Sequence, residues 1–333
     1  MLPIWTLLFF LIGLIGTRLA LRYAVRRKLL DEPGERRSHT VATPRGGGIS
    51  IVIALLVASI AMAVIYPDQT LLLGAIAVGL SLVALVGWID DHRPFSAAVR
   101  LLAHVLAAGL LAAVVYVETA RLPEAFAVFV AAVILVNIWN FMDGIDGLAA
   151  SQAVIAAAGF ALVASEPISI FFAMALIAGV CGFLPFNFPK ARIFLGDVGS
   201  GALGFALTAL YALAITTQPH HSETVQFAFL LPLSAFTVDA SLTLLKRIVQ
   251  GDRWWTAHVE HAYQYWAARV GSHPAVTAAY AFWTVLGVVA MWSVQSANEA
   301  TIMTLVIVWH LAAVVMWVWL QTRSRNSSQG RRA

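Results

Sequence analysis

Three oxygen-bearing side chains stand three residues apart, directly after an apolar run that is long enough to enter a membrane. Asn140, Asp143 and Asp146 follow the run 125–139. An Asp at the centre of a membrane helix costs roughly 2.5 to 3.5 kcal/mol, so several polar groups together indicate a water-filled or interfacial site with a function. A plain helix-capping turn would need only one carboxylate. Glycines at 144 and 147 favour a loop or a partly unwound helix, where a ligand can approach the backbone.

The same arrangement occurs at two other places in the chain. Asp90 and Asp91 end the apolar run 71–89, and Asp197 stands in the glycine-rich segment 196–201 between two further apolar runs. Adjacent carboxylates cannot both ionise cheaply unless a cation lies near them. Acidic groups at the ends of several membrane helices therefore suggest a divalent metal and a phosphorylated substrate. The alternatives are a solvated loop start for the Asp pair and a helix N-cap for Asp197.

Two histidines lie in the longest basic loop, 246–274, as His258 and His261. A zinc pair on a helix needs spacing i, i+4, so this i, i+3 pair fits phosphate binding better than zinc. Asp239 stands inside the preceding apolar segment, where it either pairs with a neighbour or lines a cavity. The single cysteine, Cys181, excludes a disulfide framework and a cysteine-rich zinc site.

The elements that must position these residues are membrane helices. Hydrophobic residues make up 60% of the chain and charged residues 11%, with a mean hydropathy of +0.83, which is typical of an integral membrane protein. The pattern predicts an all-α polytopic bundle of about 10 to 11 membrane helices, as one domain over 1–320, followed by a basic disordered tail over 321–333. The expected spans are 2–21, 48–66, 70–89, 98–117, 124–140, 148–165, 167–185, 200–217, 225–245, 274–294 and 300–320.

The positions of Lys and Arg predict the orientation of these helices. All of the 21 Lys and Arg residues except Arg18 and Arg121 lie after the first, third, fifth, seventh and ninth spans or in the tail. Because such residues concentrate on the cytoplasmic side, we expect a periplasmic N-terminus, a cytoplasmic C-terminus and a location in the bacterial inner membrane. The acidic residues and the two histidines then face the cytoplasm, where nucleotide-activated donors are made.

At these residues the chain resembles the polyprenyl-phosphate N-acetylhexosamine-1-phosphate transferases, glycosyltransferase family 4. The resemblance covers nearly the whole chain. Its motifs are Arg37-Ser-His39, Thr43-Pro-Arg-Gly-Gly-Gly48, Asp90-Asp91, Asn140 to Gly147, Asn187, Phe194 to Ser200 and the histidine loop. The pattern His258-Val-Glu-His261-Ala-Tyr-Gln264 is most similar to the branch that initiates O-antigen synthesis for lipopolysaccharide. Pro94 stands where some members have a third Asp, so no role of that residue is carried over.

The resemblance implies transfer of a sugar 1-phosphate from a UDP-N-acetyl sugar to undecaprenyl phosphate, with release of UMP. It implies Mg²⁺, with Mn²⁺ as an alternative, held by Asn140 and Asp197. The expected catalytic residues are Asp90, which resembles the group that deprotonates or positions the lipid phosphate, with Asp91 and Asp143. The expected substrate-binding residues are Asp146 and Phe194 at uracil, together with Asn187, Arg100, Arg192, His258, His261 and Arg45.

Two other classes remain open from the residues alone. A polytopic protein with intramembrane Asp could be a cation-coupled transporter or lipid flippase, although related halves are not visible in the sequence. A membrane phosphatase acting on lipid diphosphates would not depend on a nucleotide. Besides the two substrates we expect membrane lipids as partners, consider a homodimer and expect no nucleic acid. The sequence does not identify the donor sugar.

Overall fold

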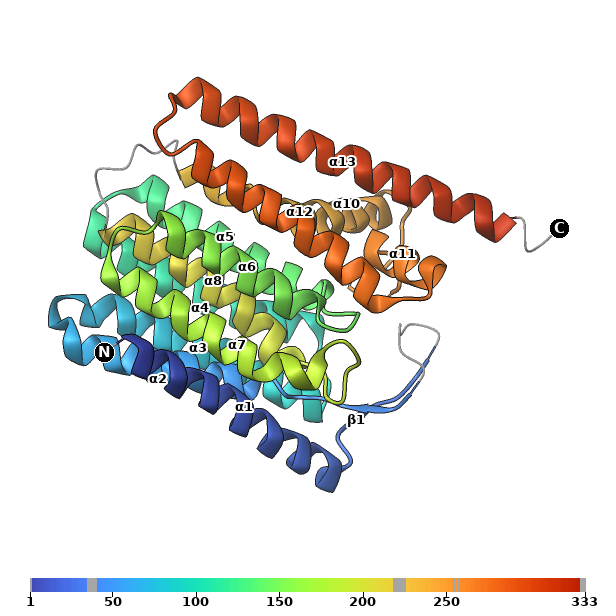
Figure 1. The fold of residues 1–333 in the computed structure, drawn as a ribbon, viewed down its shortest axis with the longest axis horizontal. Helices are drawn as coiled ribbons and strands as arrows, with labels where there is room; N and C mark the ends of the chain where they lie inside the picture. Colours follow the sequence, from blue (N-terminus) through green and yellow to red (C-terminus); the bar gives the residue numbers. More distant parts are fainter. Residues whose placement is uncertain (1, 35–40, 218–225, 254, 257, 330–333) are drawn as a thin grey trace.

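The protein is a bundle of long helices with one small hairpin, seen in a computed structural model that describes residues 2–34, 41–217, 226–253, 255–256 and 258–329 (Figure 1). The helices are α1 (Leu2–Arg27), α2 (Ile49–Ile65), α3 (Thr70–His92), α4 (Ala97–Thr119), α5 (Leu122–Phe141), α6 (Leu148–Val163), α7 (Pro167–Asn187), α8 (Asp197–Thr217), α10 (Ser234–Val249), α11 (Ala262–Val270), α12 (His273–Ser293) and α13 (Glu299–Gln329). Short 3-10 helices occupy Pro67–Gln69 and Ala228–Leu230.

Eight of these helices are long and apolar enough to cross a membrane, and α2 and α6 are shorter apolar helices. The prediction of an all-α polytopic membrane protein is confirmed. The expected ninth span, 225–245, is not one continuous helix in its described part, because a short 3-10 helix and a turn precede α10. At the other end, α13 runs to Gln329 and so continues into the segment for which a disordered tail is predicted.

The all-α fold predicted from the sequence did not include the two-stranded hairpin that follows α1. Strand β1 (Leu30–Asp31) pairs antiparallel with β2 (Thr43–Pro44), with Leu30 opposite Pro44. The residues from Thr43 onward then lead into α2. The hairpin therefore fixes the segment Thr43–Gly48 at the end of the bundle where α1 finishes (Figure 1).

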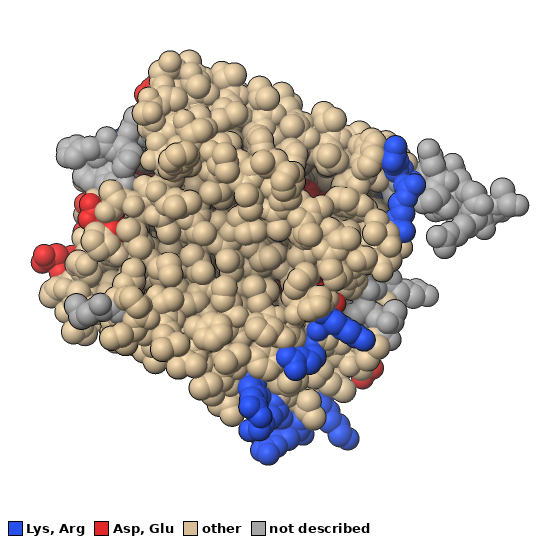
Figure 2. Space-filling model, in the orientation of Figure 1, with Lys and Arg blue, Asp and Glu red and all other residues tan. Residues whose placement is uncertain are grey.

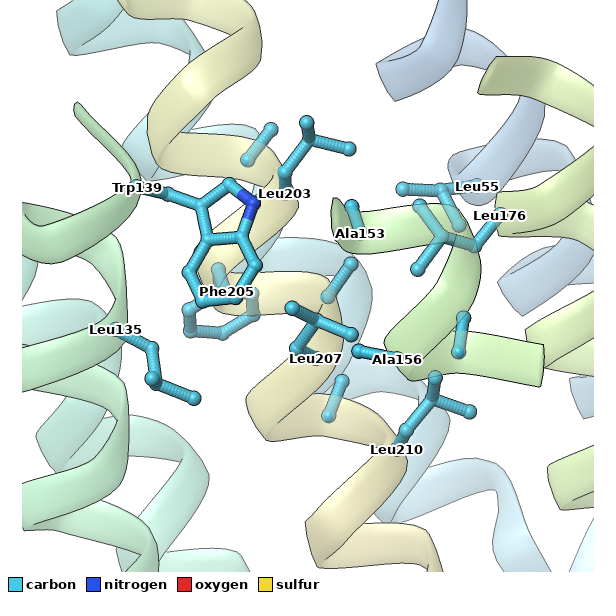
Figure 3. Packing of buried hydrophobic residues seen from close by; sticks show 14 of the residues in the cluster. Leu55, Leu135, Trp139, Ala153, Ala156, Leu176, Leu203, Phe205, Leu207 and Leu210 are labelled. Carbon is cyan, nitrogen blue, oxygen red and sulfur yellow. The ribbon is translucent and has the colours of Figure 1, made fainter. Parts of the chain in front are cut away.

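Helix α8 lies at the centre of the bundle, with 89% of its apolar window buried. Small residues let neighbouring helices approach its backbone closely. A Cβ on Gly204 would meet the carbonyl oxygen of Leu135 on α5. Figure 3 shows Trp139 and Leu135 facing Leu203 and Phe205, with α6 and α7 side chains completing the core. This packing holds the first residue of α8, Asp197, at a fixed place relative to α5.

Charged residues are distributed unevenly along the bundle. On the face seen in Figure 2, Lys and Arg lie toward the end where α1 and α13 finish. The ends of α3 and α5 and the start of α8 reach the same end of the bundle. The predicted site residues are therefore brought to the basic end.

Candidate active site

One arginine joins carboxylates from two helices at the basic end of the bundle. Nη1 of Arg100, in the first turn of α4, lies 3.2 Å from Oδ2 of Asp90 and 3.0 Å from Oδ2 of Asp197. Asp90 is held in place by a second bond, because its Oδ1 accepts from the backbone N–H of Phe95 at 2.6 Å. The side chains of Arg100 and Asp197 remain about a third exposed, at 31% and 28%. A ligand can therefore reach this cluster.

Asp91 has a different role from its neighbour. Its carboxylate is buried and accepts from the backbone N–H groups of Asp197 (3.2 Å) and Val198 (3.3 Å). These are the first amides of α8, which have no partner within the helix and carry partial positive charge. Asp91 therefore caps α8, and the alternative in which Asp197 caps its own helix does not occur. Gly196 has φ +75°, and a Cβ there would crowd Oδ2 of Asp91.

Arg45 completes the surroundings of Asp91. Its Nε lies 3.7 Å from Oδ1 of Asp91, and its Nη2 donates to the backbone carbonyl of Asp91 at 2.5 Å. Arg45 follows β2, so the hairpin segment is tied to the end of α3. The described bonds of Arg45 serve the fold, and its position beside the carboxylates is compatible with its predicted role in substrate binding.

Asn140 lies next to the start of α8. Its Nδ2 donates to Oγ of Ser200 at 3.1 Å, and Ser200 is one turn beyond Asp197. Asn140 on α5 therefore lies against the first turn of α8, the turn that Asp197 begins.

The loop between α5 and α6 carries an acid without a compensating charge. The pKa of Asp143 is raised to about 8 because the carboxyl of this half-buried residue is desolvated and because Asp197, Asp91 and Asp146 add negative charge nearby. No cation and no hydrogen-bond donor among the described residues contacts it. Asp146 instead lies 3.3 Å from Nδ1 of His273 at the start of α12. His273 was not predicted, and the only signal in the sequence is its place at a helix start after Ser272.

Asn187 connects two loops of the site. It is buried at the end of α7, where its Oδ1 accepts from the N–H of Gly147 (2.9 Å) and its Nδ2 donates to the carbonyl of Ile193 (3.0 Å). Both ends of the carboxamide are therefore used by backbone. Phe194, in the second loop, donates its N–H to Pro44 and accepts from Gly47. The motif that contains Phe194 is thus bound to the hairpin segment.

The histidine loop is held against the end of α5 through Asp239. This buried carboxylate on α10 accepts from the N–H groups of Ala262 (2.8 Å) and Tyr263 (3.1 Å), which begin α11, and from the hydroxyl of Tyr280 (2.8 Å). Tyr263 in turn donates its hydroxyl to the carbonyl of Phe141 at 3.1 Å. Asp239 therefore pairs with neighbours, which decides between the two roles left open by the sequence.

The two histidines lie side by side in this loop. The rings of His258 and His261 are stacked with centroids 4.9 Å apart. Burial, together with nearby positive charge from His261 and Arg247, lowers the pKa of His258 to about 4. His258 is therefore neutral at pH 7. Arg247 and Lys246 are also bound to Glu260, which the motif analysis did not single out.

One predicted residue, Arg192, does not join this assembly. Arg192 donates to the carbonyl of Pro185 at 2.7 Å, lies over the ring of Phe186, and lines a groove beside α1 with Arg18 and Arg22. The motif Arg37-Ser-His39 lies outside the described residues.

The polar end of the bundle suits a hard divalent cation. Over the described residues there is no ready-made group of three or more His, Cys, Asp or Glu side chains for a metal. Asp90, Asp197, Asn140 and Asp143 nevertheless offer only oxygen donors, which Mg²⁺ and Mn²⁺ prefer. Arg100 is the cation that contacts Asp90 and Asp197, while Asp143 has none. The two carboxylates of Asp90 and Asp197 face the single positive charge of Arg100, and this surplus of negative charge fits a bound cation near Asp197 and Asn140.

Comparison with known proteins agrees with this geometry. The family described as Glycosyl transferase family 4 matches residues 72–216. Residues 72–216 belong to this family. A probable undecaprenyl-phosphate N-acetylglucosaminyl 1-phosphate transferase of Bacillus subtilis (strain 168) is 29% identical over 254 residues, covering 71% of this chain and 69% of that protein.

Two further relatives extend the comparison. The decaprenyl-phosphate N-acetylglucosaminephosphotransferase of Mycobacterium leprae is 29% identical over 289 residues, 73% of this chain and 70% of that protein. The phospho-N-acetylmuramoyl-pentapeptide-transferase of Synechococcus sp. (strain JA-3-3Ab) is 34% identical over 210 residues, 56% of this chain and 60% of that protein. The family resemblance and the assignment as a transferase are confirmed.

The glycosyl transferase family 4 region contains only part of the site. It includes Asp90, Asp91, Arg100, Asn140 and Asp197, all of which meet at the start of α8. The histidine loop and the Asp239 that holds it lie beyond residue 216. The acidic cluster and the histidine loop are therefore separate in the sequence, and the fold joins them through the contact of Tyr263 with Phe141.

Proposed function

We propose that the chain transfers a sugar 1-phosphate from a UDP-N-acetylhexosamine to undecaprenyl phosphate and so begins a lipid-linked glycan such as O-antigen. The observation that carries the proposal is the cluster of Asp90, Arg100 and Asp197, joined by Asn140, at the basic end of a membrane bundle. A lipid phosphate and a nucleotide diphosphate can meet at such an end. Family membership favours this reaction over a transporter or a phosphatase.

In the proposed reaction an oxygen of the lipid phosphate attacks the phosphorus that carries the sugar. The bond from that phosphorus to the oxygen bridging the two phosphates breaks, and the bridging oxygen leaves with UMP. Asp90 accepts the proton of the lipid phosphate or orients its oxygen, and Arg100 holds Asp90 in position. Asn140 and Asp197 would hold Mg²⁺, which when bound neutralises negative charge on the diphosphate and on the departing UMP.

The other residues bind the donor. Asp146 accepts a hydrogen bond from uracil, and Phe194 stacks on the uracil ring. His258 and His261 contact the donor phosphates or the sugar, and the low pKa of His258 makes it a neutral hydrogen-bond partner rather than a cation. Asn187 and Asp91 act by holding loops and the start of α8. Arg192 is not assigned to the donor, because its contacts lie beside α1.

The test of this function is incubation of the purified chain with undecaprenyl phosphate, Mg²⁺ and each of several UDP-sugars, followed by measurement of UMP. UDP-N-acetylglucosamine is the first donor to try, since two of the relatives described above are named for that sugar. UMP release that needs both the lipid and one donor supports the proposal. Phosphate release from a lipid diphosphate without any nucleotide would favour a phosphatase instead.

The proposed orientation places the N-terminus in the periplasm and the site in the cytoplasm. Reporter fusions after Asp91 and Ser200 should give cytoplasmic signals, and a fusion after Gln69 a periplasmic one. A periplasmic signal at Ser200 would remove the access of a cytosolic donor to Asp197.

A further inference from the structure

A groove of about 520 Å³ lies between the second half of α1 and the end of α7. Beside it the two helices touch closely, because a Cβ on Gly13 would meet the carbonyl oxygen of Gly179, and one on Gly182 would meet that of Phe10. The groove begins where this glycine contact ends. Its lining residues are Leu14, Arg18, Leu21, Arg22, Pro185, Phe186 and Arg192.

Three guanidinium groups surround this groove. Arg18 and Arg22 are exposed and one helical turn apart on α1, so they project on the same side. Arg192 lines the groove from the loop after α7, where it is fixed by the carbonyl of Pro185 and by the ring of Phe186. No carboxylate among the described residues lies within ion-pair distance of these three arginines. Within the described part of the chain, these three charges therefore have no anionic partner.

Apolar side chains that can contact lipid acyl chains lie beside the groove. Helix α1 is a candidate membrane span, and Ile15 and Leu19, on either side of Arg18 in the sequence, are 54% and 56% exposed. Apolar side chains exposed on a membrane span face acyl chains. Arginine can keep its stem among them while its guanidinium reaches the polar boundary. Figure 2 shows Lys and Arg gathered at the end where α1 finishes.

We propose that this groove binds the phosphate of an anionic bilayer phospholipid. Two of the three guanidinium groups can each form paired hydrogen bonds with phosphate oxygens, and the first part of an acyl chain lies against Leu14, Leu21 and Phe186. The volume of the groove is within the range of about 300 to 1,000 Å³ that is typical of small-molecule sites. The site is separate from the acidic cluster at α8 and does not depend on the transfer reaction.

Native mass spectrometry of the purified full chain in detergent tests this site. Phosphatidylglycerol is titrated against the wild type, against Arg18→Gln/Arg22→Gln, and against the matched control Arg26→Gln/Arg27→Gln. The control removes the same charge from exposed residues of α1 that do not line the groove. Phosphatidylethanolamine replaces phosphatidylglycerol in a parallel titration, and inorganic phosphate and undecaprenyl phosphate are added as competitors.

The groove variant should bind phosphatidylglycerol at least about tenfold more weakly, the effect of losing one charge-assisted contact, and the control within about twofold of wild type. Phosphatidylethanolamine should bind weakly to all three proteins, and millimolar inorganic phosphate should not displace the lipid. Equal losses in both variants would mean unspecific attraction to basic residues and would overturn the proposal. Displacement of phosphatidylglycerol by equimolar undecaprenyl phosphate would assign the groove to the acceptor and likewise overturn it.

Discussion

Replacing Asp239 by Ala should release the histidine loop from the bundle. The change leaves the buried N–H groups of Ala262 and Tyr263 without their acceptor. Each buried donor that loses its partner costs about 1 to 3 kcal/mol, so the two together predict a loss of about 2 to 6 kcal/mol. Water entering the space left by the carboxylate would bring the loss to the lower end of that range. Asp239→Asn keeps one acceptor oxygen and should lose less.

Hydrogen exchange measured by mass spectrometry is the assay, because it reports the first turn of α11 directly. A local loss of about 2 kcal/mol corresponds to amide exchange roughly 30-fold faster at residues 262–263. Glu124→Gln is the matched control: Glu124 is also buried, is paired with Arg121 at 2.9 Å, and belongs to the first turn of α5, at the opposite end of that helix from Asn140. This control should leave exchange at α11 and transfer activity unchanged.

In the same experiment the loop around Asp143 should also exchange faster, since Tyr263 binds the carbonyl of Phe141. Tyr263→Phe should loosen that loop while leaving the N–H groups of α11 protected. Unchanged exchange at residues 262–263 in Asp239→Ala would refute the reasoning, whatever happened to the overall stability.

Three further predictions concern the acidic cluster and the donor. The pKa of Asp143 is about 8 in the folded protein and 3.8 ordinarily, so the wild type loses stability as pH rises between these two values. The thermal stability of Asp143→Asn relative to wild type should therefore rise with pH up to about pH 8 and then level off. A constant difference from pH 5 to 9 would contradict this. Asp197→Ala should remove nearly all transfer, and EDTA should reversibly stop the wild type, whereas full activity in EDTA would exclude the metal role. Phe194→Ala should weaken UMP binding, measured by calorimetry, by about 1 to 3 kcal/mol. Asp90→Asn should bind UMP normally and lose transfer. Weakened UMP binding in Asp90→Asn with normal binding in Phe194→Ala would exchange their roles.

The helices and the main acidic positions followed from the sequence, because long apolar runs and charges at their ends are local patterns. Asp90, Asn140 and Asp197 were predicted to share one site, and the fold brings them together. The distinction between Asp90 and its neighbour was not predictable. Asp91 caps a helix that begins 106 residues later in the chain, and a contact at that separation leaves no periodic pattern.

Other features depended on tertiary packing in the same way. The partner of Asp146 is His273, from a helix more than a hundred residues away, and the role of Asp239 required α10, α11 and α12 to be placed together. Arg192 was assigned to the substrate by its position in a motif, whereas its side chain lies toward α1. The hairpin of β1 and β2 has only two residues in each strand, too few for an alternating pattern.

The central claim is that a sugar and its own phosphate move together from the nucleotide to the lipid. The most direct measurement uses a UDP-N-acetylhexosamine that the chain accepts, labelled with ³²P in the phosphate attached to the sugar, together with undecaprenyl phosphate and Mg²⁺. The account predicts that the label passes into the lipid product and that the released UMP carries none. Label remaining in a released nucleoside diphosphate, with an unlabelled lipid product, would show transfer of the sugar alone and would contradict the account.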